Sequence, residues 1–84
     1  MLVSKNPFVK YRAIQGKMFL VYKNRAYCFK ETEEFIWSMI DGKNSFEYMV
    51  KAIIEKYNIA ESVAEEDLHN FLNSLLNANL IKNN

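Results

Sequence analysis

Residues 8–30 alternate between apolar and polar side chains with period two, and β-branched and aromatic residues are frequent among them. This pattern is typical of strands rather than helices. It predicts three strands, over residues 8–14, 17–22 and 25–29. Gly16 supplies the turn between the first two, and the polar pair Lys23 and Asn24 forms a short link to the third. The segment therefore predicts a small antiparallel sheet.

From Glu31 onward the hydrophobic period changes to 3.6, which predicts helices. The expected helices cover residues 32–41, 45–57 and 63–78. Thr32 is the expected N-cap of the first helix and Gly42 its left-handed end, while Ser45 would cap the second. The first helix is expected to bury Phe35, Ile36, Met39 and Ile40, with Trp37 on the flank of that stripe.

The third helix is predicted to begin with a capping box, because Glu65 follows Ser62 by three residues. Asn79 stands where the chain would turn out of this helix, since Asn tolerates the left-handed conformation. Leu80 and Ile81 are then expected to fold back onto the core. The last three residues, 82–84, are expected to fray.

Three strands followed by three helices predict an α+β fold in which the helices pack on one face of an antiparallel sheet. This order resembles a winged-helix arrangement with its sheet at the front. The chain has 84 residues, and a chain of this size cannot divide its buried surface between two cores. We therefore expect one domain over residues 1–84.

Charge is divided along the chain, although the net formal charge is only +1. Residues 1–30 carry seven Lys or Arg and no acid, whereas residues 31–84 carry four Lys or Arg and ten acids. The sheet half is thus strongly basic and the helical half acidic.

Membrane insertion and export are not indicated by the hydrophobic runs. The longest apolar run covers residues 18–22, far short of the roughly 20 residues that cross a bilayer, and the first residues do not form a signal peptide. A single cysteine, Cys28, excludes an internal disulfide and fits a reducing compartment. These features predict a cytoplasmic protein.

The sequence contains few residues of the kinds that carry out catalysis or bind metal ions. His69 is the sole histidine, Cys28 the sole cysteine, and no Gly-x-Ser-x-Gly sequence occurs. The consecutive acids of residues 65–67 point in different directions on a helix, so they do not form a metal site. We expect no catalytic residue, no metal and no cofactor, with Cys28 as a small buried residue and His69 as a half-exposed one.

Two other functions remain open from the residues alone. A small winged-helix domain could bind nucleic acid, but no Lys or Arg lies between Lys56 and Lys82, and the acids of the third helix would repel phosphate. An assembly subunit could instead dock its sheet edge on another protein or on its own copy.

An ordered set of sequence pieces resembles the PqqD-like family, also called the RiPP recognition element, where RiPPs are ribosomally made peptides modified after translation. The set consists of Phe29-Lys30-Glu31-Thr32, Phe35-Ile36-Trp37, Ile40-Asp41-Gly42, the capped stretch from Ser45 to Tyr57, Asp67-Leu68-His69-Asn70-Phe71-Leu72, Leu75, and Asn79-Leu80-Ile81. Together these pieces span about two-thirds of the chain.

The resemblance implies a non-catalytic, stand-alone protein that captures the leader of a precursor peptide. The leader would add a strand to the third predicted strand and lie in the groove beside the third helix. A separate maturation enzyme, such as a radical SAM enzyme, a cyclase or a leader peptidase, would then act on the precursor. The predicted peptide-binding residues are Arg25, Ala26, Tyr27, Cys28, Phe29, Lys30, Asp67, Phe71, Ser74 and Ala78.

One detail of this binding site stays open at the level of sequence. The groove could meet the flank of the third helix that carries Ser74 and Ala78, or the opposite flank with His69 and Asn73. The cations Lys23, Arg25 and Lys30 are expected to favour an acidic leader.

Overall fold

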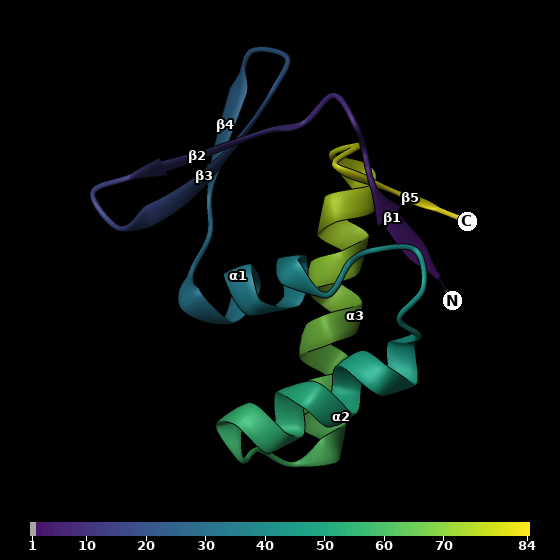
Figure 1. The fold of residues 1–84 in the computed structure, drawn as a ribbon. Helices are drawn as coiled ribbons and strands as arrows, with labels where there is room; N and C mark the ends of the chain where they lie inside the picture. Colours follow the sequence, from purple (N-terminus) through teal and green to yellow (C-terminus); the bar gives the residue numbers. More distant parts are fainter. Residues whose placement is uncertain (1) are drawn as a thin grey trace.

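A computed structural model describes residues 2–84 and shows a three-stranded antiparallel sheet followed by three helices (Figure 1). This arrangement confirms the predicted α+β fold class. The elements are β1 (Val3–Lys5), β2 (Lys10–Ile14), β3 (Lys17–Tyr22), β4 (Arg25–Cys28), α1 (Glu31–Ser38), α2 (Phe46–Tyr57), α3 (Glu61–Asn77) and β5 (Ile81–Asn83).

The main sheet has the strand order β2-β3-β4, so β3 is its central strand. A two-residue turn joins β2 to β3, and both of its residues, Gln15 and Gly16, have positive φ angles of 51° and 77°. Positive φ at both positions matches the twist of an antiparallel hairpin. Met18 and Leu20 of β3 are buried on the inner face, which faces the helices.

The first strand of this sheet begins at Lys10, two residues later than predicted. Asn6 is the reason, because its side-chain oxygen accepts from the Phe8 N–H at 2.9 Å and its carbonyl accepts from Val9 at 3.1 Å. These bonds form a turn that leaves Phe8 outside the sheet and 78% exposed. The third predicted strand also ends one residue early, at Cys28.

A second, two-stranded sheet joins the two ends of the chain and was not predicted. β1 pairs antiparallel with β5 (Figure 1), and the Ser4 hydroxyl donates to the Asn84 side chain at 2.7 Å. The prediction that residues 82–84 fray is therefore wrong. Leu80 and Ile81 do return to the core, as expected, and both are buried.

The first helix differs from its prediction at both ends. Its N-cap is Lys30 rather than Thr32, and the Glu33 carboxylate accepts from the Lys30 N–H at 2.8 Å. The helix ends at Ser38, because Asp41 draws the chain into a turn by accepting from the N–H groups of Lys43 and Asn44, both at 2.9 Å. Gly42 has the expected positive φ, but it lies in this turn instead of at the helix end.

The second helix agrees with its prediction. The Ser45 hydroxyl accepts from the Tyr48 N–H at 3.0 Å, and Asn58 ends the helix in the left-handed conformation. The third helix begins at Glu61, with Ala60 as N-cap, so the predicted capping box at Ser62 is wrong. Asn79 has a φ of 62°, as its position after α3 predicted.

The core lies where the inner face of the sheet meets the helices, and α3 crosses its centre. Leu68, Leu72 and Leu75 of α3 are buried. Trp37 is also buried, although it was predicted on the flank of α1, whereas Phe35 is only partly buried and packs edge-on against Tyr57. Burial of Trp37 ties α1 to the sheet.

Candidate functional site

The free edge of β4 is one side of the candidate site. In the β3–β4 pair, Tyr22 faces Arg25 across the turn, and pairs alternate along the ladder between hydrogen-bonded and non-hydrogen-bonded. This alternation points the N–H and C=O groups of Ala26 and Cys28 away from β3. The edge therefore offers unpaired backbone donors and acceptors to an added strand.

Phe29 fixes this edge against the helices. Its ring packs edge-on against Trp37 of α1, with centroids 5.8 Å apart, and against Phe71 of α3, with centroids 5.4 Å apart. Such aromatic pairs add to the stabilisation that burial alone provides. The spacing between β4 and α3 is therefore held by side-chain packing.

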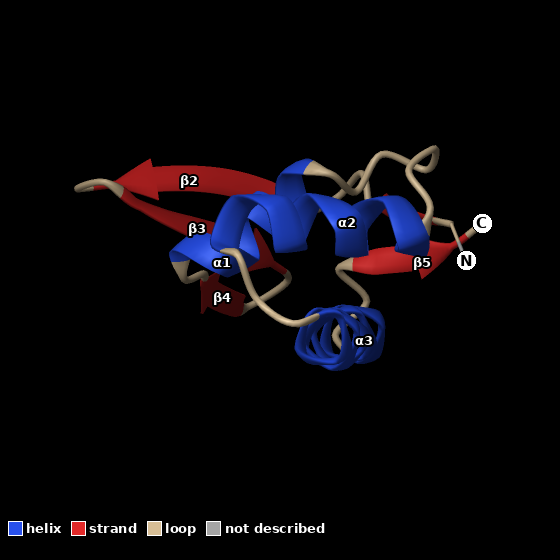
Figure 2. Ribbon diagram, turned by 90° about the horizontal axis from the view of Figure 1, so that it is seen from below, coloured by secondary structure: helices blue, strands red, loops and turns tan. Residues whose placement is uncertain are grey.

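A hollow of about 430 Å³ lies between β4 and α3. Its strand side is formed by the residues from Ala26 to Phe29. Its helix side is formed by Phe71, Ser74, Leu75 and Ala78, and Glu33 and Leu80 complete the lining. Figure 2 looks along α3 and shows β4 at the sheet edge on the side of this helix, with β2 at the far edge. Small residues on α3 leave room beside the strand.

Two further hollows extend this space in both directions. One of about 450 Å³ includes Lys30 and Asp67 and shares Phe71 and Ser74 with the central hollow. The other, of about 480 Å³, includes Arg25 and shares Tyr27 and Ala78 with it. Because neighbouring hollows share lining residues, they form one groove along β4 and α3, which we call the β4 groove.

Each residue predicted to bind peptide lies along the β4 groove. The structure also settles which flank of α3 faces it, because Ser74 and Ala78 line the groove, while His69 and Asn73 hydrogen-bond each other at 3.1 Å. Cys28, predicted to be buried, is exposed, since its side chain lies on the outer face of the sheet. Contact with a peptide remains a prediction for all of these residues.

Glu33 and Leu80 also line the central hollow and were not predicted. Glu33 could have been found from its position three residues after Lys30, which is the spacing of the carboxylate in a capping box. Leu80 could not have been found from the sequence, because its position beside the hollow depends on the path of the chain after α3.

The two ends of the β4 groove differ in charge. At the end near the β3–β4 turn, Lys23 and Arg25 are lining cations without a lining acid. At the other end, Lys30 shares the lining with Glu33 and Asp67. A negatively charged peptide segment is therefore attracted mainly to the turn end.

The sole histidine, His69, does not line the β4 groove, whereas the sole cysteine, Cys28, does. His69 points its hydrogen bond to Asn73, one turn along the same helix, rather than to Cys28. Within residues 2–84, no three side chains of His, Cys, Asp and Glu come close enough together to hold a metal ion. Over the same residues, no helix combines the length and apolar character needed to span a membrane.

The fold and the groove together define a small α+β protein with an open sheet edge beside a helix. A sequence profile of the PqqD family, described as coenzyme PQQ synthesis protein D, matches residues 17–81. The chain therefore belongs to the PqqD family. No curated protein sequence matches it significantly.

Two solved structures share the fold. TbiB1 in complex with the TbiA(beta) leader peptide has a TM-score of 0.84 and 23% sequence identity, covering 96% of each chain. The PqqD truncation of Methylobacterium extorquens PqqCD, described as a functional and stand-alone RiPP recognition element, has a TM-score of 0.80 and 15% identity, covering 98% of this chain and 89% of the other.

Proposed function

We propose that this protein binds the leader segment of a ribosomally made precursor peptide in the β4 groove. The observation that carries the proposal is the unpaired β4 edge beside a continuous groove on α3, in a chain of the PqqD family. A TbiB1 structure of the same fold is described as a complex with a leader peptide, which supports this use of the fold.

Binding by strand addition follows from the backbone geometry. The leader pairs its main chain with the free N–H and C=O groups of Ala26 and Cys28, which provides affinity that depends little on sequence. Alternate leader side chains then point inward, against Phe71, Ser74 and Ala78. These inward positions select apolar side chains, while the charges of Lys23 and Arg25 favour acidic residues near the turn end.

The protein itself performs no chemistry in this proposal. It holds the precursor so that a separate maturation enzyme, such as a radical SAM enzyme, a cyclase or a leader peptidase, can modify it. Because the precursor is made by the ribosome, we place this step in the cytoplasm. Neither the family nor the related structures point to a nucleic-acid partner, and the acidic residues at the start of α3 are exposed.

A titration of the isotope-labelled protein with candidate leader peptides tests the proposal. We expect amide shifts concentrated on residues 25–30 and on the Phe71 side of α3, with micromolar or tighter affinity. Candidate leaders come from short genes encoded next to that of this protein. Unchanged spectra with every candidate would falsify the proposal.

Two variants and a control separate groove binding from general surface binding. Ala26→Pro removes an edge N–H without breaking the β3–β4 ladder, and Ser74→Trp fills the groove from an exposed position. Ala26→Pro should weaken leader binding by about tenfold, the cost of one lost hydrogen bond, and Ser74→Trp should weaken it by at least as much because the indole occupies the space of a leader side chain. His69→Ala, on the opposite flank of α3, should leave the affinity unchanged.

A further inference from the structure

The main sheet has a second open edge, at β2. All residues of this strand are exposed, and the strand order leaves its outer side unpaired. Ile14 faces Lys17 across the two-residue turn, so the alternation of the ladder points the N–H and C=O groups of Tyr11 and Ala13 outward. The β2 edge therefore offers the same backbone groups as the β4 edge.

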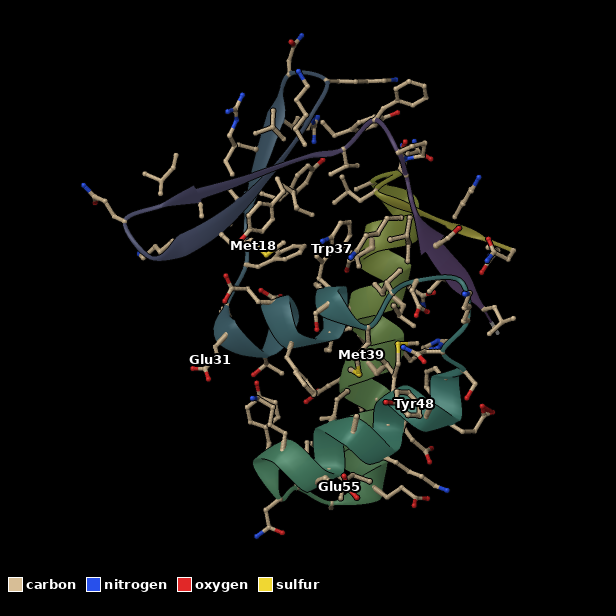
Figure 3. All side chains as sticks on the ribbon, viewed as in Figure 1. Met18, Glu31, Trp37, Met39, Tyr48 and Glu55 are labelled. Atoms are coloured by element: carbon tan, nitrogen blue, oxygen red, sulfur yellow. The ribbon has the colours of Figure 1, made fainter. Side chains whose placement is uncertain are left out.

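A groove also lies beneath the β2 edge. It has a volume of about 550 Å³ and lies between the inner face of β2 and β3 and helix α1. Its apolar lining comes from Val9, Tyr11, Met18, Leu20 and Trp37, and its charged lining residues are Lys5 and Glu34. Figure 3 shows Trp37 extending from α1 toward the sheet, where Met18 lies. The Lys5 amine lies 5.2 Å from the centre of the Trp37 ring. We call this space the β2 groove.

Exposed apolar side chains are concentrated around the β2 edge. Phe8, Tyr11 and Ile14 are 78%, 60% and 55% exposed, and they belong to the few large hydrophobic residues that are exposed within residues 2–84. Apolar side chains gathered at an unpaired edge mark an interaction surface. Tyr11 belongs both to this edge and to the groove below it.

The charge around the β2 edge selects the kind of strand that can pair with it. Lys10, Arg12 and Lys17 share the outer face of the hairpin, and residues 1–30 contain no acid. Pairing with the β2 edge of a second copy would bring like charges together, which is destabilising. An added strand with acidic side chains on the outer face would instead be attracted.

We propose that the β2 edge binds an extended acidic segment of the maturation enzyme, in which acidic and apolar residues alternate. The acidic side chains of that segment lie beside Lys10 and Arg12, and the apolar ones point into the β2 groove toward Trp37. We assign this edge to the enzyme because, in the proposed function, the enzyme must come close to the precursor while the leader occupies the β4 edge. This inference rests on the proposed function, since it assumes leader binding there.

The two edges allow both partners to bind at once. They lie on opposite sides of β3, and across three strands the edges are separated by roughly 10 Å. An enzyme segment at β2 and a leader at β4 would then extend one continuous sheet of five strands. The protein would bring the precursor and the enzyme together without either displacing the other.

A peptide of alternating Glu and Val residues tests the β2 edge on protein already saturated with a bound leader. We expect shifts of the backbone amide resonances of residues 10–14 and of the Trp37 indole N–H resonance, with the leader still bound at residues 25–28. The matched peptide of alternating Lys and Val should bind much more weakly. Equal response to both peptides, shifts confined to residues 25–28, or stronger binding of single-stranded DNA to residues 10–14 would each overturn the proposal.

Variants at equivalent positions of the two edges make the result specific. Ala13→Pro removes an outward N–H of β2 and should weaken binding of the Glu-Val peptide by about tenfold without affecting the leader, whereas Ala26→Pro should do the reverse. Arg12→Glu provides a test that does not depend on backbone changes, and it should weaken Glu-Val binding about fivefold. If Arg12→Glu and Ala13→Pro both leave this binding unchanged, the proposal is wrong even where leader binding at β4 is intact.

Discussion

The two open edges of the main sheet present the same backbone chemistry in different surroundings. The β4 edge lies beside α3, with small side chains and a mixture of charges along its groove. The β2 edge lies above α1, with Trp37 beneath it and Lys10, Arg12 and Ile14, but no acid, on the outer face of its strand. The elements that flank each edge, rather than the strands themselves, therefore set which peptide each can select.

This difference has a physical basis in how strand addition works. Main-chain hydrogen bonds contribute affinity to almost any extended segment, whereas neighbouring pockets and charges discriminate between segments. A small sheet with two free edges can therefore serve two partners, provided that each edge has different side chains around it. Substitutions should therefore divide into those that affect both edges, one edge, one end of an edge, or neither, in decreasing order of effect.

Leu20→Ala should damage both edges together. Leu20 is fully buried on the central strand, and removing a buried leucine side chain costs about 2–5 kcal/mol of unfolding free energy. Chemical denaturation measures this loss, and leader binding should weaken as the folded population falls. Arg12→Ala, on the exposed face of the neighbouring strand, is the control and should change stability by less than about 0.5 kcal/mol. Equal losses in the two variants would contradict this account of the core.

Phe71→Ala should affect the β4 edge alone. The Phe71 ring lines the β4 groove and packs against Phe29, so its loss should weaken leader binding by about tenfold, as expected for an aromatic side chain at an interface. Calorimetric titration measures the affinity, with unfolding followed in parallel. Binding of the Glu-Val peptide at β2 should not change, and an equal loss at both edges would show that the grooves are coupled.

Charge reversal should distinguish the two ends of the β4 groove. Arg25→Glu is expected to weaken an acidic leader by about threefold at low salt, with a smaller effect as salt rises. Lys30→Glu should have less effect, because Glu33 and Asp67 already line that end. The comparison needs affinities at two ionic strengths. If Lys30→Glu weakens leader binding more than Arg25→Glu does, the turn end is not the end that attracts the acidic segment.

Acidification should weaken the turn between α1 and α2 without acting on either edge directly. Hydrogen bonds from the backbone N–H groups of Asn44 and then Lys43 lower the pKa of Asp41 below its ordinary value of 3.8. A lowered pKa means that Asp41 contributes stability above the ordinary value and that this contribution disappears as pH falls through the lowered pKa. Thermal unfolding of the protein and of the Asp41→Ala variant between pH 5 and pH 2 measures this contribution to stability. The difference between the two should shrink toward the acid end of the range, and a constant difference would refute the role of Asp41.

Local sequence signals predicted the elements that depend on neighbouring residues. The spacing of Met49, Val50 and Ile53 marks the buried face of α2, and Ser45 caps it as expected. Gly16 likewise identifies the turn of the first hairpin, because a two-residue turn requires positive φ. Such features are readable because the interacting groups are a few residues apart.

Capping was harder to predict because several residues compete for each helix start. Thr32 and Ser62 both have good capping side chains, yet the helices begin earlier, at Glu31 and Glu61. At α1, the Glu33 carboxylate satisfies the Lys30 N–H, which makes the earlier start favourable. The choice between neighbouring caps depends on how the preceding strand or loop enters the helix.

The sequence by itself determined the periodicities, the order of the three main strands and the three helices, and the resemblance to the PqqD-like family. Only the tertiary structure decided that β1 pairs with β5, that Trp37 is buried, and that Ser74 rather than His69 faces the groove. It also left both outer strands of the main sheet, β2 and β4, with an unpaired edge. These properties depend on contacts between residues far apart in the chain, whose energies exist only after the helices have packed on the sheet.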